Sequence, residues 1–344
     1  MTPGRGRPPG VDFASMPRWV RVASVPVMVV AGGLTSVQAQ ITGTFRAELG
    51  TGLRAAGMAA TVSMLGGLFT IMVIALLVPA ARRGVATLVR SIRSGAYPWW
   101  TFVGGCVGGV FVLSQALAVS VIGVALFAVA AVAGQTTASL VVDRTSLAPG
   151  GPQPLSAARV VAASAAIAAV FVASVGGIAT DGGPTWEIVV LVLLPFLGGA
   201  GNAFQQAVNG RVAQIAGPVP STALNVTLAT TVVLVFLCAT LIAPGESFHA
   251  WPTQWWMYLA GLIGLLFIFL AAILVHVHGV LTLALLTIAG QVIAAEILNA
   301  FAPGGAMTPA SAVAALLVVA GVAVALFSAR RRPVPSAAAR AGTS

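Results

Sequence analysis

Long apolar runs follow one another along almost the whole chain, separated by short polar segments. A helix that crosses a bilayer needs about 20 mostly apolar residues, and ten runs meet that length. They cover residues 22–42, 55–79, 99–119, 122–142, 159–179, 187–209, 221–243, 255–275, 279–300 and 309–328. The pattern predicts an all-α integral membrane protein with ten transmembrane helices, flanked by polar tails at 1–21 and 329–344.

The composition agrees with a chain that is surrounded by lipid. Of its 344 residues, 58% are hydrophobic and 7% are charged, whereas an ordinary soluble domain is about 25% charged. Too few polar side chains are present to cover a water-facing surface of this length. Cys106 and Cys238 lie inside apolar runs, where we expect free thiols that pack as small apolar groups. Soluble enzymes, disulfide scaffolds and disordered chains are excluded.

The charged residues predict the orientation in the membrane. The net charge of +10 comes from 17 arginines against seven acidic residues. With both termini on one side, fifteen arginines fall on that side, and only Arg46 and Arg54 fall on the other. Cytoplasmic segments are rich in Lys and Arg, so both termini are expected in the cytoplasm of a multi-pass protein of the bacterial plasma membrane. We interpret the arginines as topology signals and headgroup contacts rather than nucleic-acid ligands, because no basic stretch is interleaved with stacking aromatics.

The chain also repeats itself. Residues 99–140 match residues 255–296 at 15 of 42 positions without a gap, and a weaker match aligns residues 38–50 with 205–217. The first match includes Trp99-Trp100 with Trp255-Trp256, Gly123 with Gly279, and Gly134-Gln135 with Gly290-Gln291. Each half, 22–179 and 187–328, therefore holds five helices. Because five is odd, the halves are inverted in the membrane, an architecture typical of secondary transporters that work by alternating access.

Polar residues inside the predicted helices are the candidates for function, because they are costly in lipid. Residues three and four apart lie on one helix face. Two helices carry such a stripe, and the stripes are Thr35, Gln38 and Thr42, and Asn202, Gln205 and Asn209. They are interpreted either as the hydrogen-bonding lining of a substrate path or as interhelical hydrogen bonds. Gln135 and Gln291, each after a glycine, leave the same two interpretations open.

Glu296 is the carboxylate that lies well inside an apolar run. It is either a proton-coupling group or a glutamate that reaches the interface or pairs with a loop. The second alternative is favoured because the equivalent residue in the first half is Leu140, and Glu296 lies about one turn from the end of its run. A charge-poor interior favours a neutral, zwitterionic or lipophilic solute as substrate.

Enzyme signatures are missing from the sequence. No H-E-x-x-H, G-x-S-x-G or Walker A motif occurs, which argues against a protease, a hydrolase or an ATP-driven pump. His276 and His278 share a short turn without a nearby cysteine or carboxylate, so we expect no metal site. No enzymatic activity, catalytic residue or cofactor is expected, and the sequence leaves the oligomeric state open.

The repeated motifs resemble those of a known family. The quoted elements are Gly32-Gly33 with Gln38; Gly199 with Gln205 and Asn209; and Trp99-Trp100, Gly104-Gly105, Gly108, Gly123, Gly134-Gln135, Ser139 and Asp143-Arg144. Over about residues 23–328 the chain is similar to the YdcZ-like branch of the drug/metabolite transporter superfamily. It departs at Thr42, where that pattern has Asn, and at Ala295 and Asn299, where it has Ser and Asp.

The resemblance implies two fused five-helix units, cytoplasmic termini, a central substrate cavity, and energy from an ion or proton gradient or from a substrate gradient. The sequence thus predicts a secondary transporter that moves a small solute across the inner membrane by alternating access. Two alternatives remain: a non-transporting membrane scaffold or sensor, and a lipid-headgroup flippase of the same superfamily.

Overall fold

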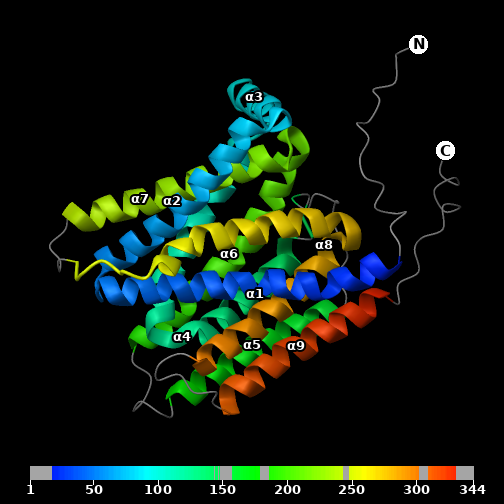
Figure 1. Cartoon of the computed structure of the whole chain (residues 1–344). Coiled ribbons are helices and arrows are strands. Elements are labelled where there is room, and N and C mark those ends of the chain that lie inside the picture. The colour runs from blue at the N-terminus through cyan, green and yellow to red at the C-terminus, as the bar shows by residue number, and fades with distance from the viewer. Residues whose placement is uncertain are drawn as a thin grey trace, which may run out of the picture.

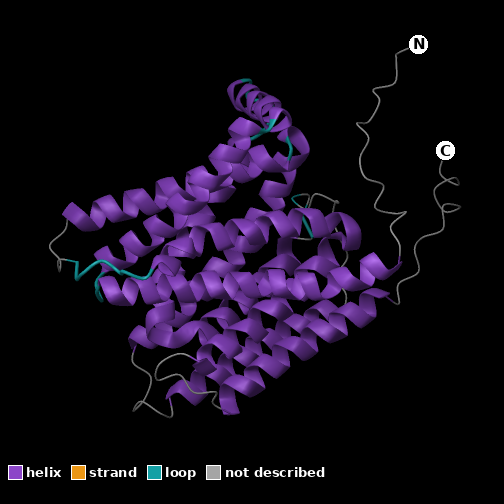
Figure 2. Cartoon of the chain, in the orientation of Figure 1, coloured by secondary structure: helices purple, strands orange, loops and turns teal. Residues whose placement is uncertain are grey.

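The computed structural model describes residues 18–142, 144–145, 147, 157–178, 186–242, 248–301 and 309–330. In this part of the chain all regular structure is helical, in nine α-helices and two short 3-10 helices (Figures 1 and 2). They are α1 (Arg18–Leu49), α2 (Leu53–Leu77), α3 (Pro79–Arg93), η2 (Trp99–Phe102), α4 (Gly104–Val142), α5 (Ala157–Ile178), α6 (Trp186–Ala216), α7 (Pro218–Ile242), η3 (Trp255–Leu259), α8 (Ala260–Phe301) and α9 (Pro309–Arg330). The predicted all-helical class is confirmed.

Each of the ten apolar runs falls on a helix, but α4 and α8 each contain two of them. The 39 residues of α4 would extend about 58 Å if they were straight, nearly twice the thickness of the hydrocarbon core. The helix is broken at Gly123, where φ is 75° and ψ is 160°. Only glycine adopts this conformation readily. The break leaves two pieces of about 20 residues, each long enough to cross a bilayer.

Length and composition mark several helices as membrane spans. Within the described residues, five stretches are long and apolar enough to cross a bilayer, and they are Ala23–Leu49, Leu53–Leu77, Gly104–Val142, Trp186–Ala216 and Pro218–Ile242. Large apolar side chains cover the outside of the bundle, and Phe69, Leu77 and Phe301 are each more than 70% exposed. Such a surface is unfavourable in water and fits a lipid environment.

Two helices extend beyond the predicted ends of their apolar runs. α1 continues from residue 42 to Leu49, and α6 continues from residue 209 to Ala216. Phe45 and Leu49 are buried in this extension of α1, so packing inside the bundle stabilises a helical segment that hydropathy alone excludes. α1 also begins at Arg18, inside the segment predicted as a tail.

The connection after α2 contains a helix that the apolar pattern did not predict. α3 begins with Pro79 in its first turn and has Arg90 and Arg93 in its last turn. Proline is preferred at a helix start, and cations stabilise a helix end. The helix ends where the Ser94 amide donates to the Arg90 carbonyl. In Figure 1, α3 lies at one end of the bundle, next to the end of α2.

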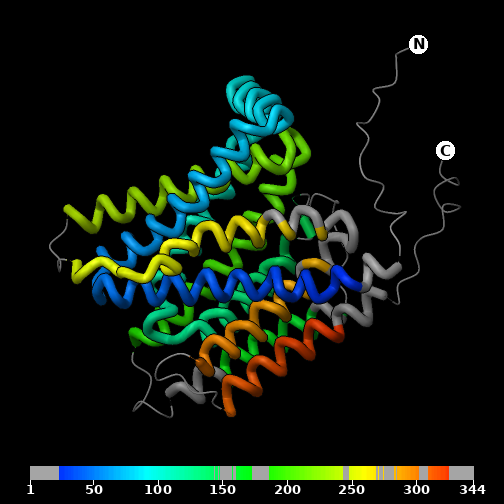
Figure 3. The backbone as a smooth tube through the Cα atoms, in the orientation of Figure 1, coloured from blue at the N-terminus to red at the C-terminus, as the bar shows by residue number. Residues whose placement is uncertain are grey.

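The long helices pack in matching pairs. α1 lies along α8, α6 along α4, α2 on α7 and α5 on α9 (Figure 3). At each of the first two crossings, two glycines face backbone carbonyls so closely that a methyl group would overlap them. The contacts are Gly32 with Thr287 and Gly290 with Val29, and Gly199 with Ala131 and Gly134 with Phe196. Small residues let membrane helices approach this closely. The shifts of 167 and 156 residues that relate the two halves also relate these two crossings.

Some predictions fall outside the described residues. The tails 1–17 and 331–344 and the residues Asp143, Asp181 and Glu246 belong to segments without a described placement, and the side chains of His276 and His278 are not described either.

Candidate functional site

Three amide side chains gather on the glycine-rich face of α4. This α4 cluster consists of Gln205 and Asn209 of α6 and Asn225 of α7. The Gln205 Nε2 donates to the Asn225 Oδ1 at 3.0 Å. The Gln205 carboxamide fills the space that Gly108 leaves open, and the Asn209 Oδ1 does the same at Gly104. The two glycines therefore make room for hydrogen-bonding groups inside the bundle.

A second polar group lies on α8. This α8 cluster consists of Gln38 and Thr42 of α1 and Ser63 of α2. The Gln38 carboxamide lies against Gly264, and the Ser63 carbonyl lies against Gly261. Thr42 Oγ1 donates to the Gln38 carbonyl at 2.9 Å. The Ser63 hydroxyl is buried and has no hydrogen-bond partner among the described residues.

The two clusters are equivalent in the sequence repeat. The shift of 167 residues carries Gln38 to Gln205, and the shift of 156 carries Gly108 to Gly264. Gln38 of the first stripe therefore lies against α8, and Gln205 and Asn209 of the second stripe lie against α4, so each contacts the long helix of the opposite half rather than the other stripe. Because α1, α4 and α8 contact one another and α6 packs on α4, both clusters belong to one central group of helices.

The equivalent residues differ in exposure. Gln38 is 9% exposed and Thr42 is 1% exposed, whereas Gln205 and Asn209 are only half-buried. Gln38 lies 12 residues before Gly50, and Gln205 lies 12 residues before Gly217. These two glycines, both at positive φ, form the α1–α2 and α6–α7 turns. Protein therefore covers the polar residues of α1 almost completely and those of α6 only in part.

The remaining stripe residues lie apart from these contacts. Thr35 Oγ1 donates to the Gly32 carbonyl of its own helix at 2.7 Å. Asn202 is half-buried, as are Gln135 and Gln291. The side chains of these three residues have no hydrogen bond to any described residue. They are available to a ligand or to water.

The end of the bundle at Gly50, the Gly50 end, is tied together by two arginines. Arg46 is 8% exposed and donates to the Leu117 carbonyl, the Ser120 hydroxyl and the Thr51 carbonyl. Leu117 and Ser120 end the first piece of α4, whose last carbonyls lose their helical partners at the break. Arg54 Nε donates to the Thr240 carbonyl at the end of α7 at 2.9 Å. Arg46 therefore joins α1 to the end of the first piece of α4, and Arg54 joins α2 of the first half to α7 of the second half.

Aromatic residues cover the same end. The Phe45 ring is buried and makes edge contacts with Tyr258 at 5.1 Å and with Trp251 at 6.3 Å between ring centroids. The His249 amide donates to the Leu49 carbonyl at 2.9 Å. The segment before α8 thus lies over the end of α1 and keeps water from the α8 cluster.

The opposite end, the Gly217 end, is held by a different set of contacts. Arg211 Nε donates to the Leu147 carbonyl at 3.1 Å, and its guanidinium lies 6.0 Å from the ring centroid of Trp100. Ser221 Oγ donates to the Asn209 carbonyl at 2.8 Å. These contacts join α6 to its neighbours at the surface and leave the α4 cluster half-buried.

Glu296 lies in the second part of α8 and is 7% exposed. Neither carboxylate oxygen has a hydrogen-bond partner at ordinary distance among the described residues, although the Ser311 hydroxyl of α9 interacts with the carboxyl group. Asn299 follows Glu296 by three residues on the same face of α8, and its Oδ1 lies next to Gly123 of α4. The carboxyl group is therefore buried in the protein, on a part of α8 that lies beside the break in α4.

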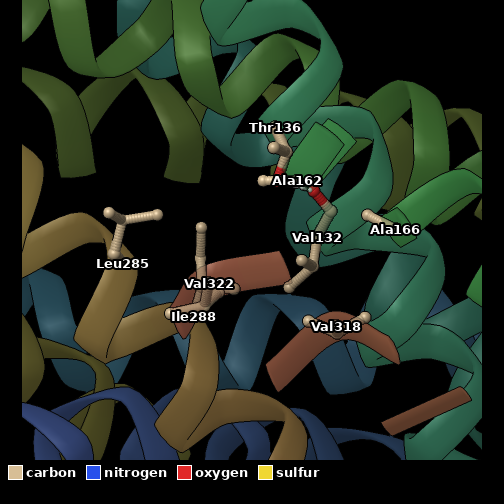
Figure 4. A pocket seen from close by; sticks show the side chains of 8 residues that line it. All are labelled: Val132, Thr136, Ala162, Ala166, Leu285, Ile288, Val318 and Val322. Atoms are coloured by element: carbon tan, nitrogen blue, oxygen red, sulfur yellow. Dashed lines mark hydrogen bonds between the residues drawn. The ribbon is translucent and has the colours of Figure 1, made fainter. Parts of the chain in front are cut away.

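A small pocket lies outside the two clusters, between α4, α5, α8 and α9 (Figure 4). Its lining is apolar apart from Thr136, and the residues are Val132, Thr136, Ala162, Ala166, Leu285, Ile288, Val318 and Val322. The Thr136 hydroxyl already donates a hydrogen bond to the Val132 carbonyl of its own helix. With a volume of about 10 Å³, it holds at most one water molecule. It is a small gap in the packing of α4 and α8 against the α5–α9 pair.

Sequence reasoning did not identify Ser63 of the α8 cluster or three further polar residues of this interior. Asn225 is the partner of Gln205, Arg46 was placed in an outer loop, and Gln115 is 3% exposed with its Oε1 unpartnered within the described residues. A glutamine in the middle of an apolar run is itself a signal. For Asn225 and Arg46 the signal is tertiary, because their partners belong to other helices.

No group of three His, Cys, Asp or Glu side chains comes together among the described residues. Cys106 and Cys238 are free thiols. The polar groups of the site are amides and hydroxyls, which can hydrogen-bond a solute but do not form a metal centre in this part of the chain.

Comparison with known proteins agrees with this architecture. The family described as "Putative inner membrane exporter, YdcZ" matches residues 24–172 and 190–324. A crystal structure described only as that of a "protein" has a similar fold, with a TM-score of 0.56 and 19% identity over 90% of this chain and 98% of that chain. No curated protein matches. The chain belongs to the YdcZ family of drug/metabolite transporters of the inner membrane.

Proposed function

We propose that the chain is a secondary transporter that exports a small neutral, zwitterionic or lipophilic solute by alternating access. The observation that carries the proposal is the difference in exposure between equivalent residues. The side chains of Gln38 and Thr42 are buried, whereas those of Gln205 and Asn209 are half-buried. Two equivalent sites with unequal access are expected when a symmetric carrier is held in one of its two end states.

The transporting unit consists of two inverted repeats of five spans, residues 22–179 and 187–328. α4 and α8 each supply two spans, which gives ten. The repeated glycine crossings support this division, because Gly32 with Thr287 and Gly199 with Ala131 make the same contact in the two halves. With ten spans, both termini lie on one side of the membrane.

The Gly217 end faces the cytoplasm. Exposed arginines gather there, on α3 and at Arg144, whereas Arg46 and Arg54 at the other end are engaged with backbone carbonyls. Cytoplasmic loops are rich in arginine. The structure then corresponds to a carrier that is closed toward the outside and accessible from the cytoplasm, the state in which an exporter takes up its substrate.

The chemistry of the site favours a substrate without a strong net charge. Gln205, Asn209 and Asn225 offer amide donors and acceptors, and no ionised side chain belongs to either cluster. Glu296 is the buried carboxyl group among the described residues, and we assign it the coupling of transport to a proton gradient. A carboxyl group that no cation neutralises can take up and release a proton as access changes.

A thermal-shift titration of the detergent-purified protein tests the binding site. The ligands are neutral amides, amino acids and lipophilic amines, and each is titrated against wild type and Gln205→Leu. A ligand at 100 times its Kd adds about 2.7 kcal/mol to the free energy of unfolding. We expect a stabilising compound whose effect is lost in Gln205→Leu and kept in Gln206→Leu, because Gln206 is exposed. In the second matched pair, Gln38→Leu is the test variant and Gln40→Leu is its control.

The proposal is overturned if a compound stabilises all four variants equally, or if none stabilises wild type while Gln205→Leu and Gln38→Leu only unfold more easily. The second result would indicate a scaffold whose polar residues join helices. Stabilisation by lipid headgroups alone would favour a flippase. The coupling role of Glu296 is tested by the same titration at about pH 6 and pH 8, where the Glu296→Gln variant should lose any pH dependence of binding.

A further inference from the structure

α3 has two chemically different faces. At 100° per residue, its arginines Arg82, Arg83, Arg90 and Arg93 fall within an arc of about 100°. Its apolar residues Ala81, Val85, Leu88 and Ile92 occupy the opposite side. All four arginines are exposed, and none has an ion pair or a side-chain hydrogen bond to another described residue. Four cations on one face of a 15-residue helix are a concentrated positive charge.

One side of α3 is fixed to the bundle. Ala81 and Leu88 are buried, and Gly84 lies so close to the Ala216 carbonyl and to Pro220 that a methyl group would overlap both. α3 therefore packs on the α6–α7 turn at the Gly217 end. The position of the helix is set by this contact and does not depend on the connecting residues alone.

A second apolar strip of α3 is left uncovered. Val89 is 41% exposed and Ile92 is 43% exposed, and on the helix they lie between the packed side and the arginines. Tyr97 and Trp99 follow directly and are also exposed. Tyrosine and tryptophan are enriched at the level of lipid headgroups. The exposed strip borders the arginines on α3, and the two exposed aromatic residues follow the helix within six residues.

We propose that α3 is an interfacial helix that binds anionic phospholipid headgroups through Arg82, Arg83, Arg90 and Arg93 while Val89 and Ile92 enter the acyl region. This arrangement is typical of amphipathic helices that lie in the membrane plane. Lipid binding by α3 requires that the protein is inserted in a membrane, and it does not depend on whether the protein transports a solute. Lipid is favoured over a protein partner because the helix directly follows a membrane span, α2, and its charges are complementary to the anionic leaflet.

The test uses the full-length protein in vesicles of phosphatidylcholine alone and with about one third phosphatidylglycerol. A fluorescent donor is attached at Ile92→Cys in a background with Cys106→Ala and Cys238→Ala, and acceptor-labelled phosphatidylglycerol or phosphatidylcholine reports which lipid gathers at α3. Each arginine near a charged surface changes affinity by about fivefold. We expect phosphatidylglycerol to be enriched over phosphatidylcholine, and Arg90→Gln to lower the enrichment by about that factor.

Arg144→Gln is the matched control, since Arg144 is an exposed arginine on a different connection, and it should leave the enrichment at position 92 nearly unchanged. Depth is measured with a spin label at the same position, which should be reached by oxygen more readily than by a water-soluble relaxing agent. Equal energy transfer to both lipids, an Arg90→Gln effect no larger than the control, or a label that is fully reached from water would each overturn the proposal.

Discussion

Arg46 shows how a charged residue is kept inside a membrane bundle. Its guanidinium replaces lost helical hydrogen bonds at the end of the first piece of α4 and also closes the α1–α2 turn through the Thr51 carbonyl. Hydropathy places such a residue in a loop, because the method counts its charge and cannot see its partners. The second half has no arginine at the equivalent position, which is occupied by Ala213.

Replacement of Arg46 by Met should weaken the Gly50 end. A hydrogen bond to a charged group contributes about 1.5–3 kcal/mol, and the change leaves the Leu117 and Thr51 carbonyls without this donor. We expect the free energy of unfolding to fall by at least about 2 kcal/mol, measured by thermal or denaturant unfolding in detergent. Arg144→Met, at an exposed position, should change it by less than about 0.5 kcal/mol; equal effects would contradict the structural role of Arg46.

The sequence predicted part of the polar site at this scale. Gln38 and Gln205 could be found because amides are rare in apolar runs and because the repeat pairs them. Asn225 and Ser63 could not be assigned, because their place near α4 and α8 depends on how α7 and α2 pack across the bundle. The prediction that the two stripes share one lining is not tested by these contacts, since Gln38 lies against α8 and Gln205 lies against α4.

At the scale of elements, apolar length predicted the helices well and their boundaries less well. The ten runs all fall on helices. Hydropathy does not report backbone conformation, so it could not show that two of these runs belong to α4 and meet at the break at Gly123. α3 was missed because its mean apolar content is low; its signal is the periodic separation of arginines from apolar residues.

The glycine crossings should be intolerant of any side chain. A Cβ atom at Gly290 would overlap the Val29 carbonyl, so Gly290→Ala must push α1 away from α8. Overpacking costs about 1–3 kcal/mol and more against backbone, and we expect a loss of at least about 3 kcal/mol in unfolding experiments. Gly66→Ala is the control, because its nearest neighbours would be 3.8 Å away; a comparable loss there would show that helical glycine in general, and not the crossing, is responsible.

At the scale of the whole molecule, the two ends of the bundle differ although the sequence repeat makes them similar. The Gly50 end carries Arg46, Arg54 and the aromatic cover of Phe45, while the Gly217 end carries the contacts of Arg211. The repeat predicts the shared plan of the halves. It cannot predict which end carries the buried arginine and the aromatic cover, because that depends on residues that differ between the halves, such as Arg46 and its equivalent Ala213.

The unequal access can be measured with single cysteines. In a background with Cys106→Ala and Cys238→Ala, Asn209→Cys should react with a membrane-impermeant maleimide applied from the cytoplasmic side, because Asn209 is half-buried. Thr42→Cys should be protected from both sides, since Thr42 is 1% exposed. Reaction is scored in inside-out and right-side-out vesicles. Equal labelling of the two positions, or labelling of Thr42→Cys alone, would contradict a structure that is closed at the Gly50 end.

The exchange of helices between the halves has a consequence for how the chain is assembled. α1 of the first half packs along α8 of the second, and α6 of the second packs along α4 of the first, so each half completes the core of the other. Two fragments cut between α5 and α6 would each expose a row of glycines without a neighbouring helix. Neither fragment is then an autonomous folding unit, but the two made together in one membrane can find each other and restore the intact bundle. We therefore expect the first half to complete its packing only after α6 and α8 have entered the membrane.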